Sequence, residues 1–408
     1  MVRLISNTVT IRDVAEAAGV SISLVSFVLN AKKGPNGEYL CSASKETAER
    51  IVDTAKRLGY KKNMAASSLR SGFSNTLGIV VADISNSFFG EVCRHIENIS
   101  ARAGYLSIFG SSDDNPEKMC QLLNRFIATG VDGLIVAPCA HTGKLLSDIV
   151  RNSVPVVIFD RDLENLAGVG KVMMDNEYAG RQATRHLIEN GHKKIEMVRY
   201  QSDIPTILQR FTGYRKEMEE NGLACYVKDN IISKPTIGID MVDVIKNSYD
   251  RGVDALIFPS NVLTVKGLTA INSLGYKIPD DFGVVGFDQG DNAEIYSPKL
   301  TYVYQPTELV AKQSFEMLHK MINEEEVSLS KTVASKFVLG MSSGSSKNAK
   351  EDSVLLCGSA FDDIGGWTSD SQFMDVMGSS YLLAHGLGHP VKDASTVFFV
   401  AKEGDYHI

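Results

Sequence analysis

From residue 77 onward the chain alternates short apolar runs with longer stretches of helical periodicity, and few folds accommodate that order. Continuous apolar runs are typical of parallel strands that are buried on both faces. The βαβ order therefore predicts a doubly wound parallel sheet. The first four runs are residues 77–82, 105–109, 133–137 and 154–159, with helices expected at residues 89–103 and 116–128.

A second series of runs predicts a second, similar α/β lobe. Its strands are expected at residues 171–174, 195–199, 255–258 and 283–286, and its helices at residues 178–190, 209–221, 239–251 and 264–274. Neither series carries a glycine-rich phosphate loop of the kind GxGxxG or GxxxxGKS/T, which disfavours a nucleotide-dependent enzyme.

Residues 10–30 predict two short helices joined by a tight turn. Thr10 and Asp13 form a capping box, and Gly19 suits the left-handed turn that ends the first helix. Ser21 is a good N-cap for the second helix, over residues 22–30. This is a helix-turn-helix unit, whose second helix enters the major groove of DNA N-terminus first. The residues expected to face the groove are Ser21, Ile22, Ser23, Ser26, Phe27 and Asn30.

Ser44 is expected to cap a third helix, over residues 45–58, which completes a three-helix head. Charge supports a DNA partner for this head. The whole chain has a net charge of −7, but residues 1–76 contain eleven basic and six acidic residues, a net charge of +5. A small basic segment beside an acidic body is typical of a DNA reader with a separate regulatory domain.

Composition narrows the class of protein further. The chain is 44% hydrophobic and 22% charged, as is usual for globular proteins. The sequence has no apolar run of 18 residues and no secretory signal at its start, so we expect no membrane span and a cytoplasmic location. The six cysteines form no CxxC pair, which predicts reduced thiols, no metal and no cofactor.

Three segments resemble the head of the LacI/GalR family of bacterial transcription regulators. They are Thr10-Ile-Arg-Asp-Val-Ala-Glu-Ala-Ala-Gly-Val-Ser21, Val25-Ser-Phe-Val-Leu-Asn30 and Tyr60-Lys-Lys-Asn63. The resemblance extends over most of residues 9–340. It implies a hinge helix in the minor groove, where a leucine wedges between base steps and kinks the duplex. The implied hinge residues are Asn63, Ala66 and Leu69.

Three features depart from the family pattern. Leu24 and Phe27 stand where the family often has Thr and Arg, Lys62 replaces a usual Pro, and the loop over residues 31–43 is longer than usual. Phe27 and Ile22 cannot hydrogen-bond base edges, but they can contact thymine methyl groups.

The resemblance also implies that the body is an effector domain that shares the fold of periplasmic sugar-binding proteins. Its ligand would lie between the lobes, at the carboxyl ends of strands. Two of the implied contacts, Phe88 and Phe89, could equally be core residues. Two others, Asp160 and Asp288, could cap helices or pair with arginine. For Asp175, Asn176, Gly180 and His192 we expect structural roles. The implied effector contacts are Asn86, Phe88, Phe89, Asp160, Arg161, Arg210, Asn261 and Asp288.

The tail departs from the family. Residues 342–346 are predicted to be a flexible linker. Residues beyond it resemble the start of a β-sandwich module, but they are too few for a whole sandwich, so a truncated or fused remnant is expected. His385 and His389 have metal-binding spacing only on a helix, which Gly386 and Gly388 disfavour.

The sequence therefore predicts four segments: a helix-turn-helix head (1–62), a hinge (63–76), a two-lobed effector and dimerisation unit (77–341) and a β-rich tail (342–408). The expected function is a homodimeric repressor that binds a palindromic operator and is controlled by a small molecule, most often a carbohydrate in this family. No catalysis is expected. Two alternatives stay open: a sugar-binding protein without a DNA role, and a regulator that responds to a purine or nucleoside.

Overall fold

A computed structural model describes residues 9–31, 43–61, 72–163, 166–201, 205–233, 237–288 and 295–344, together with two short strands in the tail. The chain divides into two units, residues 1–76 with 130–132 and the remaining residues. The predicted hinge residues Asn63, Ala66 and Leu69 lie outside the described residues.

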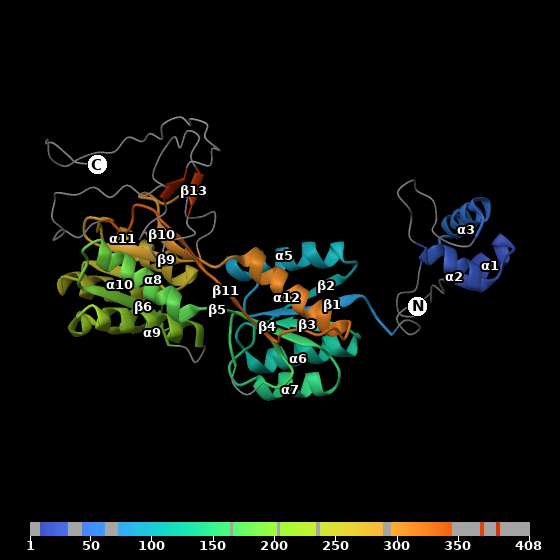
Figure 1. The fold of residues 1–408 in the computed structure, drawn as a ribbon, viewed down its shortest axis with the longest axis horizontal. Helices are drawn as coiled ribbons and strands as arrows, with labels where there is room; N and C mark the ends of the chain where they lie inside the picture. Colours follow the sequence, from blue (N-terminus) through green and yellow to red (C-terminus); the bar gives the residue numbers. More distant parts are fainter. Residues whose placement is uncertain are drawn as a thin grey trace, which may run out of the picture. The chain divides into compact units, whose positions relative to one another are not determined.

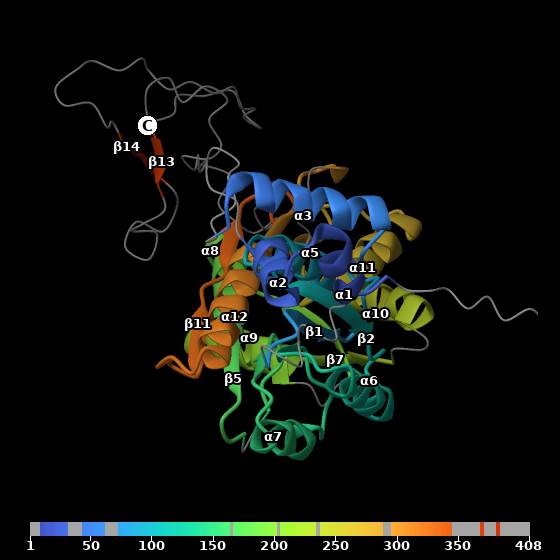
Figure 2. The same ribbon diagram turned by 90° about the vertical axis from the view of Figure 1, so that its right-hand side faces the viewer.

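The described part of the head contains three helices, which are packed together in Figure 2. They are α1 (Ile11–Ala18), α2 (Ile22–Asn30) and α3 (Lys45–Leu58). The capping box of Thr10 and Asp13 is present, and Gly19 ends α1 in the left-handed conformation at φ 62°. Ser21 and Ser44 cap α2 and α3 as predicted. Apolar side chains from all three helices form one small core.

The first lobe contains a six-stranded sheet in the order β11-β5-β4-β3-β1-β2. Helix α12 packs against α5 and against β3, β4 and β5, so it covers one face of this sheet (Figure 1). The strands are β1 (Thr76–Val81), β2 (Leu106–Ser111), β3 (Gly133–Val136), β4 (Val156–Phe159), β5 (Gly170–Met174) and β11 (Ser330–Val333). The helices are α5 (Ser87–Arg102), α6 (Pro116–Ala128), α7 (Gly143–Arg151) and α12 (Thr307–Ile322).

The second lobe repeats this plan with the order β12-β10-β9-β8-β6-β7. One core cluster lies beside α10 and α11, and another beside α8 and α9, so the sheet is buried on both faces. The strands are β6 (Ile195–Tyr200), β7 (Asp229–Ile232), β8 (Ala255–Ile257), β9 (Gly283–Phe287), β10 (Thr301–Tyr304) and β12 (Lys336–Val338). The helices are α8 (Asn176–Glu189), α9 (Pro205–Glu220), η1 (Ala224–Tyr226), α10 (Ile237–Asp250) and α11 (Asn261–Ser273).

One strand was assigned to the wrong lobe from the sequence. The run at residues 171–174 belongs to β5, which pairs with β4 and β11 in the first sheet and not with the second series. The chain therefore crosses between lobes after β5, after β10 and after β11. Three crossings join the two lobes, and the site described below lies beside them.

The predicted linker begins too early. Ser342 and Ser343 are 1% and 2% exposed, so they are part of the second lobe. The Ser342 hydroxyl donates to the Val284 carbonyl at 2.7 Å, and His192 Nε2 lies 2.8 Å from the Ser343 carbonyl oxygen. The local run of serines and glycine resembled a linker because its partners lie far away in the sequence.

The tail contains β13 (Thr368–Asp370) and β14 (Tyr381–Leu383), which pair in antiparallel fashion. His385 and His389 lie outside the described residues. Within the described part of the chain no single helix is long and apolar enough to cross a membrane, and α1 with α2 would reach that length only across a bend of 106°.

Candidate functional site

Two aspartates stand at equivalent places in the two lobes. Asp160 directly follows β4 of the first lobe, and Asp288 directly follows β9 of the second. Both have the left-handed backbone, with φ of 66° and 58°. Residues other than glycine adopt this region rarely, and such strain tends to occur at functional sites. The carboxyl ends of these strands are where open α/β sheets bind ligands.

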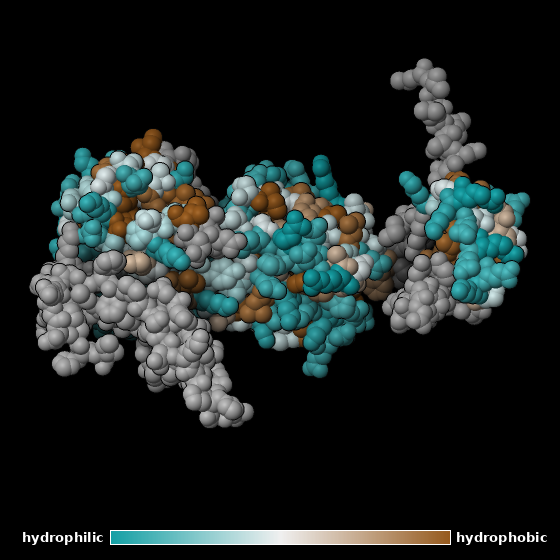
Figure 3. Space-filling model, turned by 90° about the horizontal axis from the view of Figure 1, so that it is seen from above, coloured by the Kyte–Doolittle hydropathy of each residue, from teal (hydrophilic) through white to brown (hydrophobic). Residues whose placement is uncertain are grey.

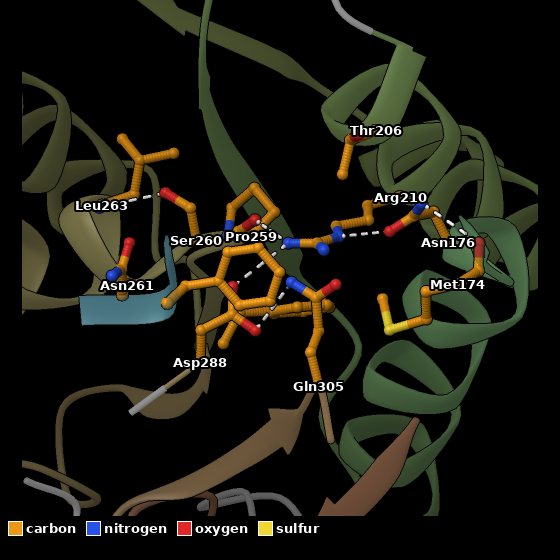
Figure 4. Close-up of polar contacts among 12 residues, drawn as sticks. Met174, Asn176, Thr206, Arg210, Pro259, Ser260, Asn261, Leu263, Asp288 and Gln305 are labelled. Atoms are coloured by element: carbon orange, nitrogen blue, oxygen red, sulfur yellow. Dashed lines mark hydrogen bonds and ion pairs between the residues drawn. The ribbon is translucent and has the colours of Figure 1, made fainter. Parts of the chain in front are cut away.

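Arg210 lies on α9 at the centre of the cluster in Figure 4 and is only 1% exposed. Its Nε donates to the Asn176 side-chain oxygen at 2.9 Å, and its Nη1 donates to the Pro259 carbonyl at 2.7 Å. The guanidinium stacks on Phe287, with 4.6 Å between its central carbon and the ring centroid. These contacts fix the plane of the guanidinium group. Within the described residues, its buried Nη2 has no hydrogen-bond partner.

The close packing of α8 on α9 determines where the backbone of Arg210 lies. A Cβ atom at Gly180 would lie 2.0 Å from the Arg210 carbonyl oxygen, and one at Gly213 would lie 2.0 Å from the Glu177 carbonyl oxygen. Only glycine permits this approach of the two backbones. The structural role expected for Gly180 is confirmed, and Asn176 combines such a role with a direct contact to Arg210.

Asp288 is held by two partners. Gln305 Nε2 donates to its carboxylate at 3.0 Å, and Arg210 Nη1 lies 3.6 Å from the other oxygen. Burial raises the pKa of Asp288, and the charge of Arg210 opposes that rise. Gln305 was not predicted from the sequence. It follows β10, a short apolar run whose polar end could have marked it as a strand-end residue.

Asp160 has a weaker partner. Arg161 Nε lies 3.6 Å from its carboxylate, while Arg161 Nη1 donates to Asp114. Burial raises the pKa of Asp160 to about 6, and the nearby charges of Arg161 and Arg210 act against that rise. The Thr206 hydroxyl, from α9 of the other lobe, donates to the Asp160 carbonyl at 3.0 Å. The two lobes therefore meet at this residue.

Asn86 and Asn261 form a second contact between the lobes. Asn86 caps α5 by accepting from the Phe88 backbone N–H at 3.1 Å. Asn261 begins α11, and its Nδ2 donates to Asn86 Oδ1 at 2.7 Å and to the Ser87 hydroxyl at 3.1 Å. Both predicted contact residues thus lie where the lobes meet.

Phe88 and Phe89 lie in the core of the first lobe, 7% and 4% exposed. Their ring centroids are 5.1 Å apart, and Phe89 lies 6.1 Å from Phe159. This placement corresponds to the core alternative, and stacking on a ligand stays a prediction. His192 is also buried, between Ser343 and Asp254, which confirms its structural role.

Helix α2 presents most of the residues predicted to face DNA. Ser21, Ser23 and Asn30 are exposed, as are Ile22 at 43% and Phe27 at 52%. The expectation that Ser26 is exposed is wrong, since this residue is only 8% exposed and lies next to buried Val25 on the packed side of the helix.

Asn30 turns back onto its own helix. Its Nδ2 donates to the Ser26 carbonyl at 2.6 Å, one helical turn earlier. Direct contact of Asn30 and the other α2 residues with bases stays a prediction.

Comparison with known proteins agrees with both units. Residues 10–63 match the family model of bacterial regulatory proteins, lacI family, and residues 184–343 match a periplasmic binding protein-like domain. Catabolite control protein A of Priestia megaterium is 31% identical over 324 residues, 78% of this chain and 94% of that protein. The transcriptional repressor PurR of Photobacterium profundum is 30% identical over 322 residues, 78% of this chain and 92% of that protein.

Solved structures share the fold. The Lac repressor dimer bound to operator and the anti-inducer ONPF matches with a TM-score of 0.70 at 19% identity, over 83% of this chain and all of that one. A putative ribose operon repressor from Burkholderia thailandensis matches with a TM-score of 0.57 at 27% identity, over 65% of this chain and 98% of that one.

A helix-turn-helix head and a two-lobed periplasmic-binding-protein-like unit define a class of DNA-binding transcription regulators. Within that class, the chain belongs to the LacI family of bacterial regulatory proteins.

Proposed function

We propose that this protein is a homodimeric repressor whose affinity for a palindromic operator is controlled by a small molecule bound where the two lobes meet. The observation that carries the proposal is the buried Nη2 of Arg210 beside Asp288, which has no hydrogen-bond partner among the described residues. A buried donor without a partner is costly, and a ligand that accepts its hydrogen bond removes that cost. The ligand then favours one arrangement of the lobes and shifts the DNA-binding equilibrium.

A carbohydrate is the first candidate for the effector. Related folds have been solved with D-xylulofuranose, in a regulator from Alkaliphilus metalliredigens at 24% identity, and with cellobiose, in the regulator CelR at 24% identity. A fixed guanidinium and two carboxylates suit the hydroxyl groups of a sugar. The proposed contacts are Asn86, Phe88, Phe89, Asp160, Arg161, Arg210, Asn261, Asp288 and Gln305. A purine or nucleoside is the second candidate, since several relatives at 28–30% identity are PurR repressors.

On operator DNA, residues 1–62 would bind in the major groove and residues 63–76 in the minor groove. Exposed Ile22 and Phe27 would contact thymine methyl groups, and the serines around them would bond to bases or phosphates. Leu69 would act as the wedge. A protein with this partner acts on the chromosome, in the cytoplasm.

Association of two copies is supported by apolar surface. Brown patches lie on both lobes in Figure 3, and Leu106 on β2 and Ile239 on α10 are 64% and 72% exposed. Exposed apolar area of this kind marks interaction surfaces. A symmetric dimer would read the two halves of a palindrome. We assign the chain a binding role and no catalysis, because its relatives are transcription regulators.

The test is operator selection from random duplexes, followed by fluorescence anisotropy with and without sugars and nucleosides. Arg210→Lys should abolish the response to the effector and keep operator binding. The ammonium group of lysine cannot replace the planar guanidinium, which donates hydrogen bonds in several directions at once. Leu69→Ala should lose operator affinity and keep effector binding. Absence of any sequence-preferring duplex binding would refute the proposal.

A further inference from the structure

One carboxylate of the proposed effector site is not balanced by its neighbours. Asp160 has Arg161 Nε at 3.6 Å, but the same guanidinium already donates to Asp114 through Nη1. Within the described part of the chain, no hydrogen-bond donor contacts the Asp160 carboxylate. Its side chain is only 10% exposed, so water screens it poorly.

The rest of the cluster adds no spare positive charge. Arg210 is occupied by Asp288, and the Asp288 carboxylate also accepts from neutral Gln305. Glu91 contributes a further negative potential at Asp288. When Asp160 is ionised, the cluster is therefore negative as a whole. The potential at Asp160 includes contributions from both Arg210 and Asp288, so these groups share one site.

The site also offers one unused donor. Arg210 Nη2 is buried without a partner among the described residues, and Thr206, one helical turn earlier on α9, already contacts the Asp160 backbone. A ligand that satisfies both groups must donate to the Asp160 carboxylate and accept from Arg210. A hydroxyl group does both, whereas an ionised phosphate or carboxylate only accepts and brings a like charge.

We propose that this site selects an uncharged, hydroxyl-rich ligand over its phosphorylated or carboxylated counterpart, and that Asp160 is the residue that determines this selectivity. The inference rests on the effector site proposed above and adds the charge class of its ligand. An anionic ligand would be repelled by Asp160 at short range in a site that excludes most water.

The experiment compares matched ligand pairs on the full chain by isothermal titration: D-ribose with D-ribose 5-phosphate, D-glucose with D-glucose 6-phosphate, and adenosine with adenosine monophosphate. The uncharged member of at least one pair should bind more tightly, on the order of 10- to 100-fold. Asp160→Asn keeps the shape of the side chain and removes its charge, so it should reduce that ratio to within a few-fold.

Asp148→Asn is the matched control, because this aspartate on α7, with its side chain 46% exposed, pairs only with nearby Arg151, at 3.1 Å, among the described residues. It removes the same charge from the same lobe and should keep the wild-type ratio. A folding defect in Asp160→Asn would weaken both members of a pair equally, so the ratio separates specificity from stability.

Three results would overturn the inference: equal or tighter binding of the phosphorylated member, an unchanged ratio in Asp160→Asn, or no binding of any uncharged member at millimolar concentration. Operator affinity is measured on the same samples. If an uncharged ligand binds with the expected ratio but leaves operator affinity unchanged, effector control fails while the assigned selectivity stands.

Discussion

Asn86 and Asn261 face each other across the two lobes, with Asn261 Nδ2 2.7 Å from Asn86 Oδ1. Each residue stands at the N-terminus of a long helix, α5 in one lobe and α11 in the other. This side-chain contact joins the two lobes directly. The free energy that separates open and closed arrangements therefore includes these hydrogen bonds, each contributing about 1 kcal/mol.

Asn261→Ala should make the ligand-free protein more open, because three hydrogen bonds between the lobes are lost. We expect a larger radius of gyration in small-angle X-ray scattering and a melting temperature lower by a few degrees. Asn272→Ala, at an exposed residue on the same helix, is the control and should change neither quantity. An unchanged radius of gyration in Asn261→Ala would show that the contact does not hold the lobes.

Gly180→Ala should destabilise the second lobe and weaken ligand binding together. The new Cβ atom would lie 2.0 Å from the Arg210 carbonyl oxygen, so α8 and α9 must separate and Arg210 must move. Overpacking of this kind costs about 1–3 kcal/mol. Gly238→Ala on α10 is the matched control, since nothing lies within 4 Å of its added Cβ. Thermal melts measure the stability of both variants, and titrations measure their ligand affinity. Equal melting temperatures and affinities in the two variants would contradict the close packing of α8 on α9 at Gly180.

Phe27→Ala should weaken operator binding without affecting the stability of the head. The side chain is 52% exposed, and surface changes usually alter stability by less than about 0.5 kcal/mol. Val28→Ala removes a fully buried neighbour and should cost about 2 kcal/mol of stability. Anisotropy with the selected operator and thermal melts of each variant separate the two effects. Wild-type affinity in Phe27→Ala would exclude this residue as a base contact.

The contribution of His186 to stability should fall as the pH is lowered from about 6.5 to about 4. Burial, with a smaller contribution from His192, lowers the pKa of His186 to about 4 in the folded state, below its ordinary value of 6.5. The unfolded chain therefore takes up a proton first, and the stability present above pH 6.5 is lost as the pH falls. The effect of this group is at most about 3 kcal/mol. Urea melts of the wild type and of His186→Gln at pH 7.5 and pH 5 measure it as a difference, because the opposite contribution of Asp160, whose pKa burial raises to about 6, is common to both proteins. Between pH 7.5 and pH 5 the wild type should lose stability relative to the variant. An identical dependence in both proteins would assign it to other groups.

Two truncations test where the second lobe ends. Removal of residues 345–408 should leave effector binding and the melting transition of this lobe intact. Removal of residues 342–408 should destabilise the lobe, because Ser342 and Ser343 supply partners to Thr301, Val284 and His192. Each buried group left without a partner costs about 1–3 kcal/mol. Equal melting temperatures of the two truncated proteins would place the end of the second lobe at residue 341, as the sequence predicts.

The elements that the sequence predicted best are those set by local interactions. Ser21, Ser44 and Gly19 begin or end helices through contacts within a few residues, so the bounds of the head helices follow directly from the sequence. Asp160 and Asp288 were predicted from the resemblance to the LacI/GalR family, and each lies at the end of a short apolar run.

The errors share a different cause. The lobe to which β5 belongs depends on pairing with β4 and β11, and the burial of Ser343 depends on His192, about 150 residues earlier. Gln305 was missed because β10 itself was not recognised. The exposure of Ser26 was misjudged because a small polar residue carries no signal of which side of a helix packs.

The left-handed backbone at Asp160 and Asp288 restricts what can replace them. Besides glycine, aspartate and asparagine are the residues that adopt this conformation most readily. A single exchange of carboxylate for amide is therefore the change that these positions tolerate with least strain. Such an exchange alters the charge of the site and hardly its shape. A family that varies here can acquire a new class of signal molecule in one substitution, while the surrounding lobes stay as they are.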